Sequence, residues 1–240
     1  MMSQLKKWSS SETRPSLKEQ QQIAALELPL VATTTPVDIP KFMGKWYVMA
    51  NIPMSLEIGA FNCVENYHWD AAKETIDVLF EYIPKGGAPQ STKAKSEMHA
   101  KIVNNPVNSF WSLNPKILGL YLPLGLSYLV LEVAEDGSYA LVGVPDRSYL
   151  WVLTRLKPTN KEGGPYKNGT LPSVPVSMAA SETTLPPIGA KGSEPVCVAA
   201  SKEIFELSTV MEGSIMQRAM AKATELGYDT DKVLNVKWTA

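Results

Sequence analysis

"IPKFMGKWYVMANIP", residues 39–53, decides the fold, because a glycine and a tryptophan stand two positions apart at the start of an apolar run. Gly44 is unfavourable inside a strand, since glycine loses the most backbone freedom on folding and offers no side chain for packing. Trp46 carries the largest side chain of the twenty amino acids. The pair indicates a strand that bends sharply at its start and then buries one very large ring.

Eight short runs, most of them rich in Val, Leu, Tyr, Trp or Phe, follow one another between residues 44 and 156. They read GKWYVMANI, CVENYHWD, TIDVLFEYI, AKSEMHAKIV, NSFWSL, LSYLVLEVA, SYALVGV and SYLWVLTRL. Turn signals such as "PKGGAP" and "AEDGS" separate them. This spacing predicts an all-β fold, an eight-stranded antiparallel up-and-down barrel, whose interior can hold one small ligand. Trp46 would then be its floor, and Gly44 the bend that admits the ring.

The composition changes before and after these runs. Residues 1–38 form a polar tail with a helical turn or more within 17–28, and residues 39–157 form the barrel. Residues 158–200 are a segment rich in Pro and Gly. Residues 201–240 carry a C-terminal helix over about 213–226, entered from as early as Ser201, and then a ninth strand in "KVLNVKW". Gly227 suits the position just after the helix.

The bulk properties exclude several classes of function. The net charge is −1, so a basic surface for nucleic acid is absent. Two cysteines do not make a disulfide scaffold, and with two histidines a zinc site would have to use carboxylates. The sequence has no nucleophile elbow, P-loop or G-x-G-x-x-G motif. We therefore predict a protein that is not an enzyme and that binds no metal.

Two features concern membranes and location. No apolar core follows Lys6 and Lys7, so no secretory signal is visible, and we expect a cytoplasmic or organellar protein, in a plastid or mitochondrion, with peripheral membrane contact as an option. The longest uncharged stretch, "ILGLYLPLGLSYLVL" at 117–131, is interrupted by two glycines and a proline. It is too short for a membrane helix and is typical of a strand end, a turn and a new strand.

The motifs "GKWY", "ALVGVPDRSYLWVLTR" and "ATELGYD" together resemble the lipocalins, in particular bacterial outer-membrane lipocalins, apolipoprotein D and plant temperature-induced lipocalins. The resemblance covers about residues 37–157 and 213–238. It implies a lipocalin calyx, in which the arginine that ends the last barrel strand packs across the tryptophan of the first. The matching residues are Arg155 and Trp46, which with Gly44 would form the structural kernel at the barrel base.

The resemblance and the two-residue period of strands give candidate ligand contacts. If Arg155 points into the barrel base, Leu153 and Trp151 lie on the same face of their strand. On the first strand, Val48 and Ala50 would follow Trp46 inward. The resemblance also favours Tyr67 in the cavity. Packing in the core is the alternative role for Trp151 and Tyr67, and a register shift of one residue would invert these assignments.

The two cysteines allow alternatives. Cys63 stands where some secreted lipocalins have a cysteine that bonds to the C-terminal region, so a Cys63–Cys197 disulfide is one reading. Cys197 precedes the helix, however, whereas the family partner follows it. Two free thiols are the default for a chain without a visible secretory signal. His68 and His99 are expected to be surface side chains of strands.

The resemblance implies that the protein binds or carries a small hydrophobic molecule, such as a fatty acid, lysolipid, sterol or pigment-like molecule, with no other cofactor. A lipocalin-fold enzyme, violaxanthin de-epoxidase, is similar at fold level, but its cysteine-rich region and glutamate-rich tail are missing here. The competing hypothesis is a scaffold. The chain would then be a subunit of a larger, membrane-bound assembly that docks through residues 1–38 and 158–200.

Overall fold

The computed structural model describes residues 29–161, 163–166 and 196–239 of the 240-residue chain. Over 196–209 the description is limited to the course of the helix. The predicted helical turn within 17–28 and most of the segment rich in Pro and Gly lie outside these ranges.

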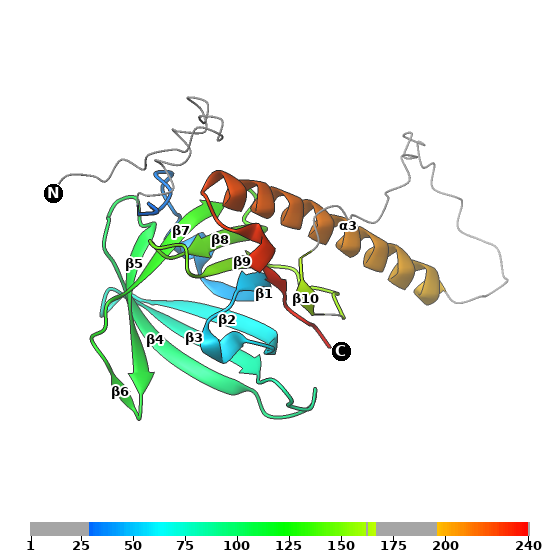
Figure 1. Ribbon diagram of the computed structural model, residues 1–240, viewed down its shortest axis with the longest axis horizontal. Helices are drawn as coiled ribbons and strands as arrows, with labels where there is room; N and C mark the ends of the chain where they lie inside the picture. Colours follow the sequence, from blue (N-terminus) through cyan, green and yellow to red (C-terminus); the bar gives the residue numbers. More distant parts are fainter. Residues whose placement is uncertain (1–28, 162, 167–195, 240) are drawn as a thin grey trace, which may run out of the picture.

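Eight long strands form a closed antiparallel barrel (Figure 1). They are β1 (Gly44–Ile52), β2 (Phe61–Asp70), β3 (Thr75–Ile83), β4 (Ala94–Ile102), β5 (Phe110–Ile117), β7 (Leu126–Val133), β8 (Tyr139–Gly143) and β9 (Leu150–Thr154). Each pairs with the next along the chain, and β1 also pairs with β9. The predicted eight-stranded barrel is confirmed.

Three two-residue strands extend this sheet: β6 (Leu120–Tyr121), β10 (Gly164–Pro165) and β11 (Leu234–Asn235). β11 is the predicted last strand, and it pairs with β1 opposite Ala50 and Asn51. β6 forms a short hairpin with the end of β5. The uncharged stretch 117–131 therefore contains a strand end, a turn and a new strand, as predicted, with the small strand β6 in addition.

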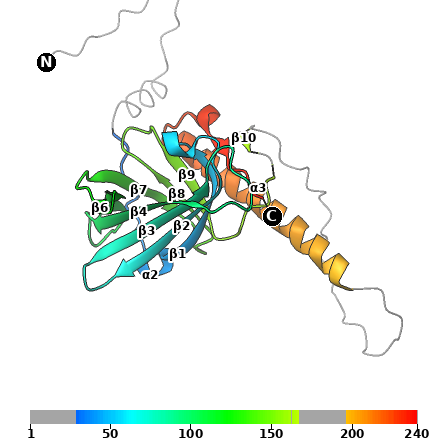
Figure 2. The same ribbon diagram turned by 90° about the horizontal axis from the view of Figure 1, so that it is seen from below.

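The described helices are α2 (Ile39–Phe42) and α3 (Val196–Glu225), with the 3-10 turns η1 (Ser55–Glu57) and η2 (Thr230–Lys232). α3 begins directly after Pro195, so the predicted boundary at residue 200 is wrong. In the part of α3 whose side chains are described, Ile215, Ala219 and Ala223 pack on the barrel. Figures 1 and 2 show the first part of α3 extending beyond the barrel. Gly227, with φ +81°, ends the helix region as predicted.

Two apolar cores flank the barrel wall. The first fills the barrel around Trp46, Tyr67 and Trp111. The second lies between α3 and side chains of β1, β7, β8 and β9. β8 and β9 are buried at every residue because both of their faces are covered. This explains why their sequences are apolar throughout instead of alternating.

Residues 29–38 were predicted to belong to the polar tail, and this is wrong. Leu30, Ala32 and Val37 are buried. The backbone N–H of Thr33 donates to the carbonyl of Val130 at 2.8 Å, and that of Val37 donates to the carbonyl of Val107. This part of the chain is therefore bound to the barrel. The sequence signal was weak because these apolar residues are interleaved with threonines and prolines.

Candidate functional site

One end of the barrel is sealed by α2, Trp46 and Arg155. The Trp46 side chain is 1 % exposed, and its indole N–H donates to the carbonyl of Phe42 at 2.7 Å. The guanidinium carbon of Arg155 lies 3.6 Å from the centre of the Trp46 ring. The predicted stack of Arg155 on Trp46 is therefore present.

Arg155 also caps α2. Its guanidinium nitrogens donate to the backbone carbonyls of residues 41, 42, 43 and 45 at 2.7 to 3.0 Å. The last carbonyls of a helix lack partners within the helix, and a planar group with five donors can satisfy several at once. Sequence analysis did not find α2. The signal that marks its start is Asp38 followed by Pro40, because Asp38 accepts a hydrogen bond from the N–H of Lys41.

Gly44 connects α2 to β1. Its φ of +93° lies in the region that side-chain-bearing residues avoid, and a Cβ there would stand 3.6 Å from a guanidinium nitrogen of Arg155. The glycine is therefore needed for the backbone of the turn, whereas the contact with Arg155 would itself tolerate a Cβ. This is the physical reason for the pairing of Gly44 with Trp46 in the sequence.

Aromatic rings fill the barrel next to this seal. The Phe42 ring lies 5.2 Å from Trp46, 5.4 Å from Tyr67 and 5.1 Å from Trp111, measured between ring centres. Trp111 stacks on Tyr128 at 4.9 Å. Tyr67 is thus directed into the barrel, as predicted, and it belongs to a packed aromatic group that includes three rings the sequence reasoning missed.

The remaining predicted ligand contacts divide between the two cores. Val48, Trp151 and Leu153 belong to the core inside the barrel. Ala50 does not: it belongs to the core under α3, so this prediction is wrong. Val48 pairs with Leu153 and Ala50 pairs with Val152, so Met49 is an extra residue and β1 contains a bulge.

The bulge shifts the alternation of β1 by one residue. Asn51, opposite Trp151, then takes the inward position that Ala50 was expected to hold. Asn51 is 3 % exposed, and its side chain hydrogen-bonds to Glu57. A bulge of this kind could not be located from the sequence, because Met49 and Ala50 are both compatible with either face.

Buried polar groups stand within this apolar interior, and we call them the polar cluster: Asn51, Glu57, Glu65, Tyr67, Tyr128 and Trp151. The Trp151 indole N–H donates to Glu57 Oε1 at 2.8 Å. The Tyr67 hydroxyl donates to Glu65 Oε2, and the Tyr67 and Tyr128 hydroxyl oxygens lie 2.6 Å apart. Sequence analysis did not place Glu57 or Glu65 in the interior. The signal was available: Glu65 stands two residues from Tyr67 and therefore shares its face.

The environment of the polar cluster shifts its protonation. Burial raises the pKa of Glu65 to about 8, and the charge of Glu57 adds to the shift. Burial also raises the pKa of Glu57, although the hydrogen bond from Trp151 opposes this. With a pKa of about 8, the Glu65 carboxyl group is mostly protonated at pH 7, so it can donate as well as accept a hydrogen bond.

Cys63 is a free, buried thiol beside these carboxyl groups. Burial raises its pKa, and the charges of Glu57 and Glu65 act in the same direction. The thiol is therefore protonated and unreactive at neutral pH. The free state of Cys63 agrees with the default expectation, whereas the side chain of Cys197 lies outside the described part of the chain.

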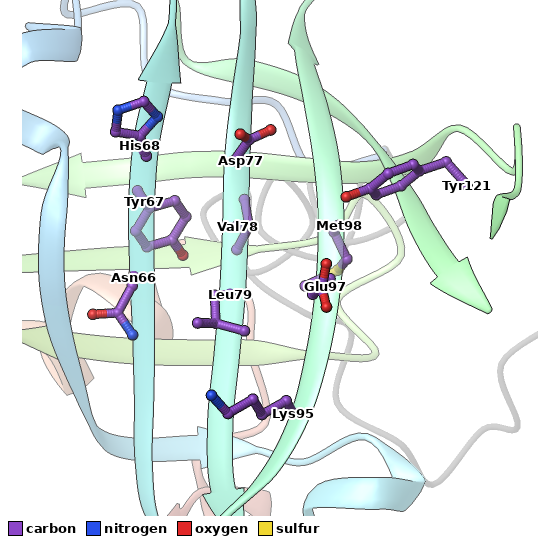
Figure 3. A pocket seen from close by; sticks show the side chains of 10 residues that line it. All are labelled: Asn66, Tyr67, His68, Asp77, Val78, Leu79, Lys95, Glu97, Met98 and Tyr121. Carbon is purple, nitrogen blue, oxygen red and sulfur yellow. The ribbon is translucent and has the colours of Figure 1, made fainter. Parts of the chain in front are cut away.

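A cavity of about 390 Å³ lies against β2, β3 and β4, with Tyr121 of β6 at its edge (Figure 3). Polar side chains from all three strands line it, among them His68, Asp77 and Glu97. His68 is exposed, and His99 Nδ1 lies 2.5 Å from Asp77 Oδ1. Among the described residues, no group of three His, Cys, Asp or Glu side chains is arranged to hold a metal ion. This lining is more polar than the interior of the barrel.

Within the same described ranges, α3 and the other helices are too short or too polar to cross a membrane.

Comparisons with known proteins agree with this architecture. The lipocalin-like domain family matches residues 37–163. Temperature-induced lipocalin-1 of Arabidopsis thaliana is 27% identical over 128 residues, which are 52% of this chain and 67% of the relative. The outer membrane lipoprotein Blc of Vibrio cholerae is 27% identical over 135 residues, 55% of this chain and 72% of the relative. Among solved structures, insecticyanin of the tobacco hornworm Manduca sexta has a TM-score of 0.51 at 15% identity, covering 88% of this chain and 86% of its own.

Proposed function

Because the chain belongs to the lipocalin family, we propose that it binds a small hydrophobic molecule inside the barrel, of the class of fatty acids, lysolipids, sterols or pigments. The observation that supports this most is a closed wall of eight strands with one end sealed by Trp46 and Arg155. A closed wall has no free edges, and the seal leaves the opposite end as the route for a ligand. Val48, Trp151 and Leu153 would form part of the apolar wall.

The polar cluster supports a choice among these molecules. Glu57 and Glu65 are buried carboxyl groups, and burial together with the charge of Glu57 already holds the pKa of Glu65 well above its usual value, so a further negative charge beside them is disfavoured. A ligand with an ionised carboxylate would add a third acid to this site. A hydroxyl or amine group would instead donate a hydrogen bond to a carboxyl oxygen. The ligand we propose is therefore an apolar molecule whose polar group is a donor.

The affinity follows from the apolar part of the ligand. Burying about ten methylene groups contributes roughly 8 kcal/mol before the losses of association and chain ordering. A dissociation constant near the micromolar range is the expected result. Binding should also give a negative heat-capacity change, because apolar surface leaves water.

A matched pair of ligands tests both statements. Oleyl alcohol and oleic acid share one chain and differ in the polar group, so each can be titrated against the tryptophan fluorescence of the full chain. We expect the alcohol to bind more tightly, and Glu65→Gln to reduce the difference. Trp151→Phe should remove most of the fluorescence change. Native mass spectrometry with lipid extraction would identify what the purified protein carries.

The outcomes separate the two statements. If neither ligand binds at high micromolar concentration while circular dichroism reports a folded barrel, the carrier function is wrong. If both bind equally well, the carrier function stands and the preference for a donor group is wrong.

A scaffold function is the second candidate, and the course of α3 favours it. The first part of this helix extends away from the barrel (Figure 2). Val210 and Met211 are exposed, and they precede Ile215, the first helix residue in the core under α3. A helix that projects in this way offers a site for a protein partner. Native gel analysis of cell extract should show the chain in a larger complex, and Val210→Asp with Met211→Asp should release it. Migration of the unaltered chain as a monomer would contradict the scaffold function.

Lipocalins are in general carriers without catalytic activity, and we propose the same for this chain. The buried thiol of Cys63 supports this, because burial keeps it protonated. Ligands recovered by extraction should have unchanged masses after prolonged incubation with the protein. A mass change that depends on the folded protein would indicate an enzyme.

A further inference from the structure

Exposed apolar side chains gather at one short hairpin. Thirteen large hydrophobic residues are exposed in the described part of the chain, and six of them fall within residues 117–126, which we call the apolar hairpin. Leu118 is 99 % exposed and Leu120 is 70 % exposed. The six are Ile117, Leu118, Leu120, Tyr121, Leu124 and Leu126. Single exposed apolar residues are normal, but a contiguous group of this kind marks an interaction surface.

The tip of the hairpin is unfavourable for folding. Leu118 and Gly119 form the turn between Ile117 and Leu120, and both have positive φ, +51° and +84°. This turn type favours Asn-Gly, because a leucine pays a steric penalty at positive φ. Leu118 gains nothing from packing at 99 % exposure. The fold of the chain itself therefore gives no reason for an apolar side chain at this position.

The backbone of the hairpin is suited to a water-poor environment. The N–H of Leu122 donates to the Pro115 carbonyl at 2.9 Å, and that of Gly125 donates to Asn114 Oδ1 at 3.0 Å. The sequence carries no charged residue from 117 to 131. Insertion into lipid is costly mainly for charges and for backbone groups without partners, and these features lower both penalties.

The base of the hairpin is polar. Lys116 Nζ lies 5.5 Å from the centre of the Tyr121 ring and 2.8 Å from Glu97 Oε2. The His99 ring stacks on Tyr121 at 3.6 Å between centres. Tyrosine and lysine are the side chains that favour the level of lipid headgroups, since each joins an apolar body to a polar end.

Neighbouring connections add apolar and basic groups at the same end of the barrel. In an antiparallel meander the connections alternate between the two ends, so β1–β2, β3–β4, β5–β7 and β8–β9 lie at the end opposite α2. Leu56 and Ile58, in the β1–β2 connection, are exposed. The β3–β4 connection, residues 84–93, contains two lysines and no acidic residue. Figure 1 shows the β5–β6 hairpin projecting from the barrel.

We propose that the apolar hairpin inserts into the surface of a lipid bilayer, with this end of the barrel facing the membrane. A convex apolar tip, a polar base and lysines beside it match a bilayer with anionic headgroups. A second copy of the chain carries the same hairpin and is the alternative occupant that the test must separate from lipid. Insertion does not require that the barrel hold a ligand.

Vesicle binding of the full chain tests this proposal. A single acyl anchor associates with bilayers with a constant on the order of 10⁴ M⁻¹, so a titration to about 1 mM lipid covers the expected range. Phosphatidylcholine vesicles with and without phosphatidylserine serve as the probe, with flotation as the assay. We expect binding to both, and tighter binding with phosphatidylserine.

The variant Leu118→Asn with Leu120→Ser removes the tip while it supplies a favourable turn sequence. We expect about 100-fold weaker binding, since each of the two leucines contributes about tenfold when it leaves water. The thermal midpoint should stay the same or rise, which separates loss of binding from loss of fold. Val103→Ser, at an exposed apolar residue in the β4–β5 connection, is the matched control and should bind as the unaltered chain does.

Two results would overturn the proposal. One is an absence of vesicle binding, or binding that the double variant leaves unchanged. The other is self-association in sedimentation without lipid that the double variant abolishes, because the hairpin would then be a contact between two copies. A fluorophore attached at Leu118→Cys, with Cys197→Ser, should shift to the blue on vesicles and be quenched by brominated lipid chains.

Discussion

Replacing Arg155 with alanine should destabilise the protein by about 3 kcal/mol. The guanidinium group donates to four backbone carbonyls at the end of α2 and the start of β1, and it stacks on Trp46. The stack contributes about 0.5–2 kcal/mol. Hydrogen bonds from a charged donor contribute about 1.5–3 kcal/mol each where they are buried.

The sum of these terms overstates the loss. Arg155 is only half-buried, so water can approach some of the freed carbonyls after the substitution. The Trp46 ring would also become more accessible, which adds a smaller apolar term. After this correction for solvent access, the expected loss of unfolding free energy is about 3 kcal/mol. For a chain of this length, the thermal midpoint should then fall by roughly 6–12 °C.

Two further variants make the result specific. Arg155→Lys keeps the charge but loses the planar group that reaches several carbonyls, so it should recover only roughly one third of the loss. Arg218→Ala is the matched control, because Arg218 lies 5.3 Å from the centre of the Tyr139 ring in a looser version of the same contact. It should cost less than 1 kcal/mol.

Guanidinium unfolding followed by tryptophan fluorescence measures all three. A loss below about 1 kcal/mol for Arg155→Ala, or one equal to that of Arg218→Ala, would refute the role of Arg155 as the cap of α2. Full recovery by Arg155→Lys would show that charge alone matters.

Three other predictions follow from the structure. The pKa of Glu65 is about 8 in the folded protein and 4.5 in the unfolded chain. Between these pH values the folded state keeps a proton that the unfolded state has lost, so the free energy of unfolding should fall as the pH rises from about 4.5 to 8. Urea unfolding at several pH values should show this slope, and Glu65→Gln should flatten it; an equal slope in the variant would contradict the assignment. Deleting 1–28 should leave the melting temperature nearly unchanged, whereas deleting 1–36 should lower it by several degrees, because Leu30 and Ala32 are buried; equal melting of both truncations would count against this boundary. Gly143→Ala should destabilise by about 2 kcal/mol, because a Cβ there would overlap the Tyr228 hydroxyl, and a near-neutral effect in thermal melting would show that Tyr228 can move.

The barrel could be predicted from the sequence because local signals and the global fold agree. Each long strand has its own run of β-favouring residues, and turn residues separate the runs. Gly44 and Trp46 indicated a bend and a buried ring by themselves, whereas the pairing of Arg155 with Trp46 came from the resemblance to the lipocalins, because no local pattern links residues so far apart in the sequence. The extent of α3 could not be predicted by its apolar stripe, because a helix that leaves the barrel wall has no need of one.

Side-chain direction within the barrel was predictable only up to the first irregularity. Val48 and Trp46 lie on one face of β1, and the alternation holds until Met49. Past the bulge every residue of β1 changes sides, so Ala50 was misplaced and Asn51 was missed. The bulge depends on how β1 pairs with β9, the two strands that close the barrel. These strands are far apart in the sequence, so the local pattern of β1 does not indicate the bulge.

The buried carboxyl groups argue for a function of the barrel interior on grounds of energy. Apolar residues at positions 57 and 65 would stabilise the core more than glutamates do. A buried carboxyl group costs free energy unless it is protonated or its oxygens accept hydrogen bonds. Glu65 has a raised pKa, and its oxygen accepts a hydrogen bond from Tyr67 inside an otherwise apolar core. Groups whose pKa values are shifted by burial gather at functional sites, although structural networks also shift them.

Glu57 and Glu65 differ in their structural roles. Glu57 caps the turn of η1 by accepting from the N–H of Met54, so it has a structural role as well. Among the described residues, Glu65 hydrogen-bonds to Tyr67 inside the barrel and caps no backbone group, so a bound ligand would account for its presence better than the fold does.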